Sequence, residues 1–153
     1  MGENLFTRAV SLLVLTGLSV MLMSSGWRTD FDRAKMDAKR AHKLILLKFS
    51  GSDWCVPCIK MEDKVFSSES FTHFAAANLE MVCADFPRMK KHKLEASLRE
   101  QNETLAEQYN KSGSFPYTVL LDADGRVLKT WDGYNGEKPE TLIQQIKSYA
   151  GTY

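Results

Sequence analysis

A short apolar run, Leu44 to Phe49, leads within a few residues into the pentapeptide Trp54-Cys55-Val56-Pro57-Cys58. This junction constrains the fold more than any other part of the chain. The run has the length and composition of a buried strand. Apolar residues then recur at helical spacing, at Ile59, Met61, Val65 and Phe66. We therefore expect a strand, a short loop and a helix that begins at the two cysteines.

Two cysteines at the start of a helix predict thiol chemistry. Unpaired N–H groups and the helix dipole favour an anion there, so the pKa of Cys55 is expected to fall from about 8.5 towards neutrality. Cys55 should face outward while Cys58 lies one turn inside, so we expect Cys55 to attack a disulfide and Cys58 to resolve the product. Pro57 fits the first helical turn, where no N–H is needed and φ is already set.

The same cysteine spacing forms half of many zinc sites, which need two further ligands. The remaining candidates, Cys83, His73 and His92, are not arranged as a second close pair. We expect neither a metal nor a cofactor. Cys83 is interpreted as a small apolar residue of a strand, and the two histidines as surface or packed side chains.

A second motif, Phe115-Pro116-Tyr117-Thr118, opens another predicted strand about sixty residues later. The bond before a proline is the realistic place for a cis peptide, and proline is tolerated at the first residue of a strand. From these residues alone, an ordinary trans proline at a strand edge remains an alternative.

Together, the cysteine box and the later proline resemble the thioredoxin family. The stretch 51–58, with Glu62 and Phe66 following, is also similar to exported bacterial thioredoxin-like proteins and to the C-terminal domain of the transmembrane thiol:disulfide interchange protein. The resemblance covers residues 30 to 150. It implies that Pro116 is cis, faces the cysteine pair and helps to bind substrate backbone, on a surface shared with Trp54.

One departure from the family concerns proton transfer. The resemblance implies a buried acid on the strand before the box, assisting the resolving cysteine, but the matching region here holds Lys48, Phe49 and Ser50. Glu62 is a substitute candidate, because on a helix it shares a face with Cys55 and Cys58. A solvated carboxylate is the alternative interpretation of Glu62.

The remaining pattern predicts an α/β protein with the thioredoxin fold, in which a mixed central sheet of about four strands has helices on both faces. The expected elements are helices from Thr29, from the cysteine box, over 70–77, over 94–109 and from Pro139, and strands over 44–50, 79–85, 117–121 and 127–131, the last two joined by an Asp-Gly turn. The connection after the second strand is longer than a minimal thioredoxin needs. Its basic run, Arg88 to Lys93, is interpreted as a solvated loop, with a partner-docking patch as the alternative.

The N-terminus differs in kind, because residues 9–27 carry no charge and are rich in Leu, Val and Met. Ser24 and Gly26 fit a signal-peptide cut before Trp27, while an uncut helix would span about 28 Å, enough for an anchor. Basic residues after this segment argue against easy export. We expect residues 1–26 to be a signal peptide or membrane anchor, and residues 27–153 to form a thioredoxin-like domain placed in a bacterial periplasm.

The net charge of +1 over 153 residues supplies no broad basic field for nucleic acid. We expect a monomeric enzyme, a thiol:disulfide oxidoreductase that acts on protein disulfides and is recharged by an upstream electron donor. Val-Pro between the cysteines resembles the Gly-Pro of thioredoxin and lacks the histidine of strongly oxidising relatives, which favours a reductant. A thioredoxin-like binding module and a copper- or metal-handling protein are the alternatives.

Overall fold

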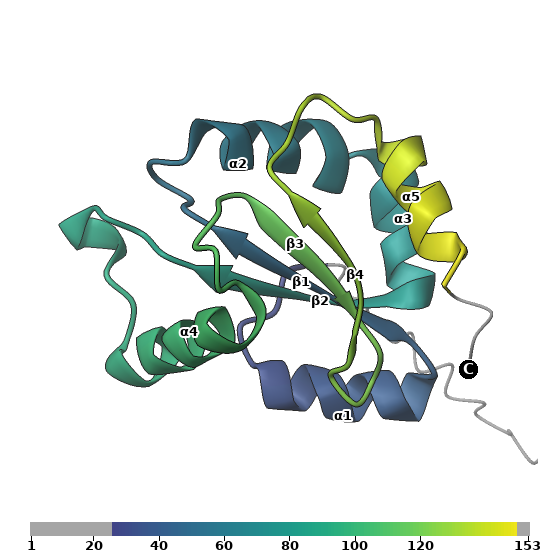
Figure 1. Cartoon of the computed structure of the whole chain (residues 1–153), viewed down its shortest axis with the longest axis horizontal. Helices are drawn as coiled ribbons and strands as arrows, with labels where there is room; N and C mark the ends of the chain where they lie inside the picture. Colours follow the sequence, from purple (N-terminus) through teal and green to yellow (C-terminus); the bar gives the residue numbers. More distant parts are fainter. Residues whose placement is uncertain (1–25, 150–153) are drawn as a thin grey trace, which may run out of the picture.

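The protein is described by a computed structural model that covers residues 26–149. Its elements, in chain order, are α1 (Phe31–Ala41), β1 (Leu44–Ser50), α2 (Val56–Met61), the π-helical turn η1 (Glu62–Phe66), α3 (Glu69–Asn78), β2 (Leu79–Asp85), the short 3₁₀ turn η2 (Lys90–His92), α4 (Ala96–Tyr109), β3 (Tyr117–Leu121), β4 (Val127–Asp132) and α5 (Pro139–Lys147) (Figure 1). The order of helices and strands is the one that the sequence predicts.

The four strands form one mixed sheet in the order β2-β1-β3-β4. β1 pairs with β2 in parallel and with β3 in antiparallel fashion, and β4 joins β3 as an antiparallel hairpin. All seven residues of β1 are buried. A strand with neighbours on both sides and helices on both faces has no solvent face, which explains its continuous apolar run.

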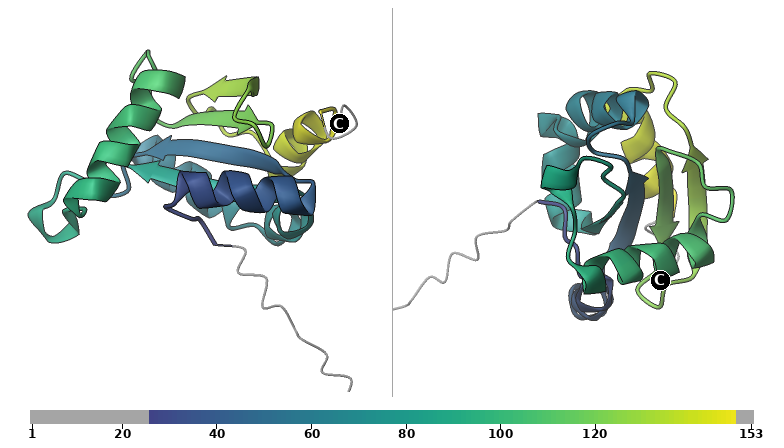
Figure 2. Two further views of the ribbon diagram at one scale, coloured as in Figure 1. Left: turned by 90° about the horizontal axis from the view of Figure 1, so that it is seen from below. Right: turned by 90° about the vertical axis from the view of Figure 1, so that its left-hand side faces the viewer.

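Helices cover both faces of the sheet, as Figure 2 shows in side view. On one face α1 and α4 pack against alternate strand residues, including Ile45, Leu47 and Val119. On the other, α2, η1, α3 and α5 pack around Leu46 and Leu120. Successive side chains of a strand point to opposite faces, so β1 and β3 contribute to both cores.

Local sequence explains where several helices begin and end. Asp30 caps α1 by accepting the N–H of Arg33 at 2.9 Å, and Ser68 caps α3 by accepting the N–H of Phe71. Pro139 occupies the first turn of α5. The Asp-Gly turn between β3 and β4 is as expected: Asp122 accepts the N–H groups of Asp124 and Arg126, and Gly125 has a φ of 89°.

The structure departs from the sequence pattern at three points. Ala41 continues the apolar spacing of Phe31, Ala34 and Ala38 in the first helix, but it is exposed, because the helix ends there and His42 turns into the left-handed region. Ile59 was expected on a buried face but is 48% exposed. The helix after the cysteine box changes from α to π hydrogen bonding at Glu62, which apolar periodicity does not reveal.

The first described residues already belong to the fold. Arg28 forms a bridge with Val82 on β2, donating its N–H to Met81 and accepting that of Cys83. The ring of Trp27 meets that of Phe66 edge-on at 5.0 Å. Most of the uncharged segment 9–27 lies outside the described residues, and among residues 26–149 no helix has the length and apolarity to cross a membrane.

Phe71 tests the core on the α3 side, since it is fully buried between the rings of Phe66 and Phe74. We predict that Phe71→Ala lowers the free energy of unfolding by about 3–5 kcal/mol, because it removes a large apolar side chain and leaves a cavity. Met36→Ala on the exposed face of α1 is the control and should change stability by less than about 0.5 kcal/mol. Denaturant unfolding of both variants measures the difference, and equal effects would contradict this packing.

Candidate active site

The cysteine pair lies where the buried strand β1 gives way to α2. Cys55 donates its N–H to Gly51 at 2.8 Å, which closes the connecting turn, and it serves as the N-cap of α2. Gly51 is required there, since a Cβ at this position would lie 2.3 Å from the ring of Trp54. Cys55 therefore reaches the start of α2 through a tight turn after β1. This turn has no room for a side chain at residue 51.

Cys55 and Cys58 form a disulfide with their Cα atoms 5.2 Å apart. The N–H of Cys58 points at the Sγ atom of Cys55, at 3.3 Å. A hydrogen bond from a helix-start amide stabilises the charged form of a sulfur, and here it reaches Cys55. The two sulfurs therefore differ: the helix-start amide lies against Cys55, the sulfur that the sequence predicts to attack.

Exposure does not distinguish them. We expected Cys55 to face outward, but it is 4% exposed and Cys58 5%, so both sulfurs are nearly covered in the disulfide form. The exposed apolar surface lies around them instead, at Val56 (59%) and Ile59 (48%), and Pro57 is exposed as well. An exposed apolar rim around a reactive disulfide fits contact with another protein.

Pro116 is placed beside this junction. The Phe115–Pro116 bond is cis, as the resemblance implied. Phe49 pairs with Tyr117, so Pro116 lies at the end of the sheet from which the cysteine loop leaves. The rings of Trp54 and Phe115, which immediately precede Cys55 and Pro116, meet at 5.4 Å. The two motifs, far apart in sequence, thus form one surface.

Lys48 and Glu62 form an ion pair between β1 and η1. Lys48 is 8% exposed and its Nζ lies 4.0 Å from the ring centre of Trp27, while both oxygens of Glu62 accept the indole N–H of Trp27 at 3.0 and 3.1 Å. A buried lysine is tolerated when a carboxylate and an aromatic face compensate its charge. The site where an acid was expected therefore holds a cation, and the carboxylate comes from the helix.

Cys83, the cross-strand partner of Lys48, is the free cysteine of the described residues. Burial raises the pKa of its thiol to about 12, although the nearby charge of Lys48 opposes the shift. The thiol is therefore neutral at physiological pH and a poor nucleophile. This agrees with the interpretation of Cys83 as a small apolar residue.

The two histidines considered as ligands lie on other elements: His73 is exposed on α3, and His92, in η2, donates its Nδ1–H to the ionised carboxylate of Asp53 at 2.9 Å. Within residues 26–149, no group of three or more His, Cys, Asp and Glu side chains is placed to hold a metal ion. The hypothesis of a metal-handling protein therefore finds no cluster of three such ligands among the described residues.

Asp53 fastens the long connection between β2 and α4 to the cysteine loop. Its two oxygens accept the N–H groups of Arg88 and Met89, each at 2.9 Å, and one also meets the ring of His92. The carboxylate is 4% exposed. These hydrogen bonds, that of Arg88 first, lower the pKa of Asp53 to about 2. Trp54 adds a second tie by donating its indole N–H to the carbonyl of Phe86 at 2.7 Å.

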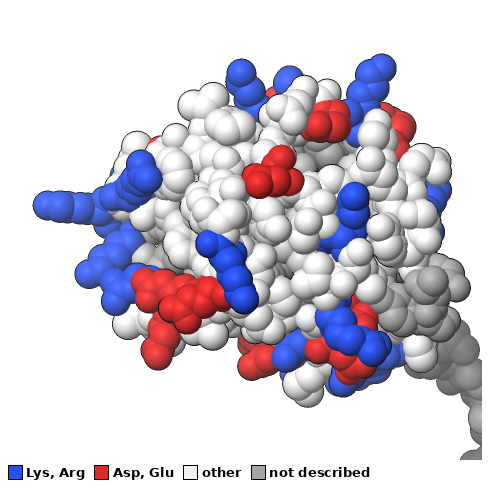
Figure 3. Space-filling view, in the orientation of Figure 1, with Lys and Arg blue, Asp and Glu red and all other residues white. Residues whose placement is uncertain are grey.

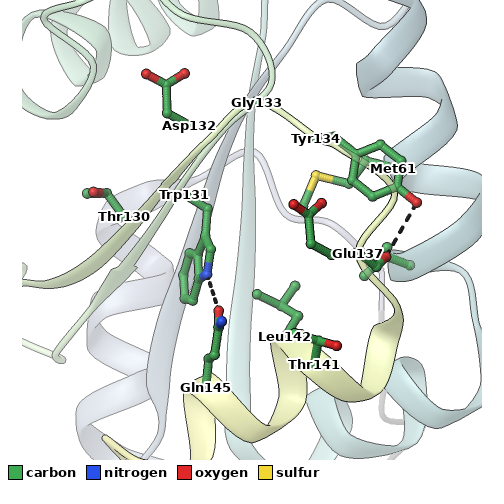
Figure 4. A pocket seen from close by; sticks show the side chains of 11 residues that line it. Met61, Thr130, Trp131, Asp132, Gly133, Tyr134, Glu137, Thr141, Leu142 and Gln145 are labelled. Carbon is green, nitrogen blue, oxygen red and sulfur yellow. Dashed lines mark hydrogen bonds between the residues drawn. The ribbon is translucent and has the colours of Figure 1, made fainter.

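Two hollows flank the site. One, of about 630 Å³, lies between Trp54, Phe115 and the β2–α4 connection. The other, of about 260 Å³, lies between the end of α2, β4 and α5, and Figure 4 shows Met61, Trp131 and Tyr134 around it. Its Gly133 donates to the carbonyl of Pro116 at 2.9 Å, so this hollow also borders the proline loop.

A family model described as a thioredoxin-like domain matches residues 31–150. The chain belongs to the thioredoxin-like family. The match includes the cysteine box, the Lys48–Glu62 pair and the loop of Pro116, and it confirms the fold expected from the sequence. Trp27 and Arg28, which pack on this thioredoxin-like domain, precede the matched residues.

Among known proteins, the chain is 47% identical over 119 residues to the disulfide bond reductase DsbH of Chlamydia pneumoniae, a match that covers 78% of this chain and 69% of that protein. The solved structure of a DsbH oxidoreductase superposes with a TM-score of 0.73 at 36% identity, covering 84% and 85% of the two chains. The oxidised C-terminal domain of DsbD from Neisseria meningitidis shares the fold, with a TM-score of 0.52 at 16% identity over 76% of this chain and 89% of that one.

Sequence reasoning missed two residues of this thioredoxin-like site. Nothing in the sequence indicates that Asp53 holds a loop, because its partners are backbone groups about thirty-five residues away. Trp27 was placed only at the border of the apolar segment, although its ring covers the Lys48–Glu62 pair. Lys48 was the one available signal for the role of Trp27, since a lysine in a buried strand requires partners that compensate its charge.

Asp53→Asn tests the anchor of the connection. The amide nitrogen cannot accept a hydrogen bond, so one of the two backbone N–H groups loses its acceptor and the other is left with a neutral amide oxygen. Amide hydrogen exchange at Arg88 and Met89 should therefore become about tenfold faster. The lowered pKa means that the tie is complete above about pH 4 and is lost as the pH falls towards about 2. In wild type, the protection at these amides, corrected for intrinsic exchange, should fall in that interval.

Asp63→Asn is the matched control, because this exposed carboxylate is paired with the neighbouring Lys64 and does not contact the connection. Unchanged exchange at Arg88 in Asp53→Asn would show that the carboxylate does not hold the loop.

Proposed function

We propose that this chain is a disulfide bond reductase whose reduced Cys55/Cys58 pair passes two electrons to disulfides of other proteins. The observation that carries the proposal is the N–H of Cys58 aimed at Cys55 Sγ at the start of α2, beside the loop of Pro116. The 47% identity to a protein named disulfide bond reductase supports the direction of electron flow. Members of this class span about −270 to −120 mV, so fold alone does not fix that direction.

The reaction follows from the roles of the two sulfurs. The Cys55 thiolate attacks one sulfur of the substrate disulfide, an S–S bond forms between them, and the other substrate sulfur leaves as a thiolate. Cys58 then loses its proton and attacks Cys55 Sγ, which releases the second substrate sulfur as a thiolate. The substrate is reduced by two electrons and the Cys55–Cys58 disulfide forms, as the structure holds it.

A further turnover needs a donor that reduces this disulfide. We propose a dithiol protein as the donor, because it can reverse the same exchange steps. We also propose a periplasmic location, with residues 1–26 as signal peptide or anchor and residues 27–153 as the working domain. Its support is the uncharged segment 9–27 and the persistence of substrate disulfides in such a compartment.

Cys58→Ser should trap substrates. Without the resolving sulfur, mixed disulfides on Cys55 cannot be released internally, so they should accumulate at least about tenfold over wild type. Non-reducing electrophoresis followed by mass spectrometry of the trapped species measures this. A binding module that works without turnover predicts no such accumulation.

The matched control is the double variant Cys55→Ser with Cys58→Ser, which retains Cys83. Because Cys83 is only partly exposed and its pKa is about 12, it should trap nothing. Equal trapping by the double variant would contradict the role assigned to Cys55.

We propose that Glu62 receives the proton of Cys58 during the second step, with Lys48 and Trp27 as positioning residues for its carboxylate. Glu62 follows Cys58 by one turn and donates its N–H to the carbonyl of Cys58. Its side chain is 38% exposed, which leaves a route for the proton to water. This arrangement replaces the family's strand acid with a carboxylate on the helix.

Glu62→Gln tests this role through the pH profile of mixed-disulfide resolution. We predict a loss of about 100-fold near pH 7 that shrinks at higher pH, where Cys58 ionises without help. Glu62→Asp keeps a carboxylate and should recover part of the rate at pH 7. A loss that is equal at every pH would mean that Glu62 acts through stability alone, which thermal unfolding of the same variants would reveal.

A further inference from the structure

A groove beside the cysteine loop is built largely by the connection between β2 and α4. This connection, with η2 at its tip, projects from one end of the molecule, at the left in Figure 1 and in the left view of Figure 2. The groove has a volume of about 630 Å³, and its aromatic lining comes from Trp54, Phe86 and Phe115. Phe115 bridges the other two, since its ring lies 5.4 Å from Trp54 and 5.5 Å from Phe86.

The groove is also basic. Its lining contains four cations, Arg88, Lys90, Lys93 and Arg99. Its two carboxylates are already engaged, since Asp85 accepts the N–H and hydroxyl of Ser52, and Glu103 lies 3.8 Å from Arg99. Within residues 26–149, the side chains of Lys90 and Lys93 make no ion pair or hydrogen bond. Figure 3 shows Lys and Arg gathered on this projection, with acidic side chains below them.

Arg88 is held by contacts of both its side chain and its backbone. Its guanidinium lies 3.7 Å from the ring centre of Trp54, while its backbone N–H is bound by Asp53. Stacking on an aromatic face leaves the edge of a guanidinium free to donate two parallel hydrogen bonds to a carboxylate. Met89, 48% exposed, adds apolar surface next to it.

The groove borders the cysteine box and the proline loop. Two of its lining residues, Trp54 and Phe115, immediately precede Cys55 and Pro116, so one end of the groove is next to the residues that a substrate cysteine would approach. An extended chain advances about 3.3 Å per residue, so the residues next to that cysteine can lie along the cations.

We propose that this groove binds an extended acidic segment of the partner protein, adjacent to the cysteine that Cys55 attacks. This inference rests on the proposed function and adds a partner preference to it. The unpaired lysines supply attraction over distance, Arg88 supplies a bidentate contact, and the aromatic lining takes the apolar parts of the segment. The proposal develops the alternative interpretation of the basic run Arg88 to Lys93 as a docking patch, and it specifies that the docked segment is acidic.

Two synthetic peptides with the same internal disulfide test the preference. One carries a run of Asp and Glu beside the first cysteine, and the other carries Asn and Gln at the same positions. The rate at which each oxidises the reduced full chain is measured in a single turnover, by alkylation of the remaining thiols and mass spectrometry. We expect the acidic peptide to react about tenfold faster at low salt, and the two rates to converge near 1 M salt, where the screening length falls to about 3 Å.

The double variant Lys90→Gln with Lys93→Gln should lose most of the ratio between the two peptides. Both lysines are exposed, so the substitutions should leave folding intact. Lys129→Gln with Lys147→Gln removes the same charge from β4 and α5, away from the projection, and should keep the ratio. This pair separates a local groove from the effect of net charge.

Equal rates for the two peptides at low salt would overturn the inference while leaving the reductase intact. So would a preference that survives in the Lys90/Lys93 variant. Failure to reduce either peptide would overturn both the inference and the proposed function. Equal peptide rates combined with Lys90- and Lys93-dependent binding to vesicles of anionic lipid would instead assign the cations to a membrane surface.

Discussion

The complete burial of β1 is the constraint on which the rest of the molecule depends. Because this strand has hydrogen-bonded neighbours on both sides and helices on both faces, its last residue has one fixed position. The chain then makes a tight turn at Gly51, and this turn places Cys55 at the N-cap of α2. The position of the reactive sulfurs is thus set by a completely buried strand, and a site built on such an element can be precise.

The same burial creates an electrostatic problem at Lys48, whose backbone lies in the centre of the sheet. A lysine cannot be buried there alone, and its compensation by Glu62 and Trp27 ties the strand, the π turn and the first described residues together. The π turn begins at Glu62 itself, and such turns often occur at functional sites. The Lys48–Glu62 ion pair therefore both stabilises the fold and contains the proposed proton acceptor.

Much of this arrangement is readable in the sequence because it depends on local patterns. The apolar run of β1, the caps of α1 and α3 and the Asp-Gly turn each act over a few residues, and the resemblance supplied the cis bond at Pro116. What could not be predicted depends on distant partners: Asp53 binds backbone groups of the β2–α4 connection, and Lys48 finds its carboxylate on another element. Even the burial of Cys55 depends on packing around the turn, which helical periodicity does not encode.

The way in which the β2–α4 connection is attached has a consequence for how such proteins diverge. Asp53 holds it by the amides of residues 88 and 89, and Trp54 by the carbonyl of residue 86. Every residue except proline has a backbone N–H, and every residue has a carbonyl, so the charges on the connection can be exchanged during evolution while its path is kept. The cysteine chemistry and the choice of partner can then vary separately, and one redox scaffold can serve lineages whose substrates differ in charge.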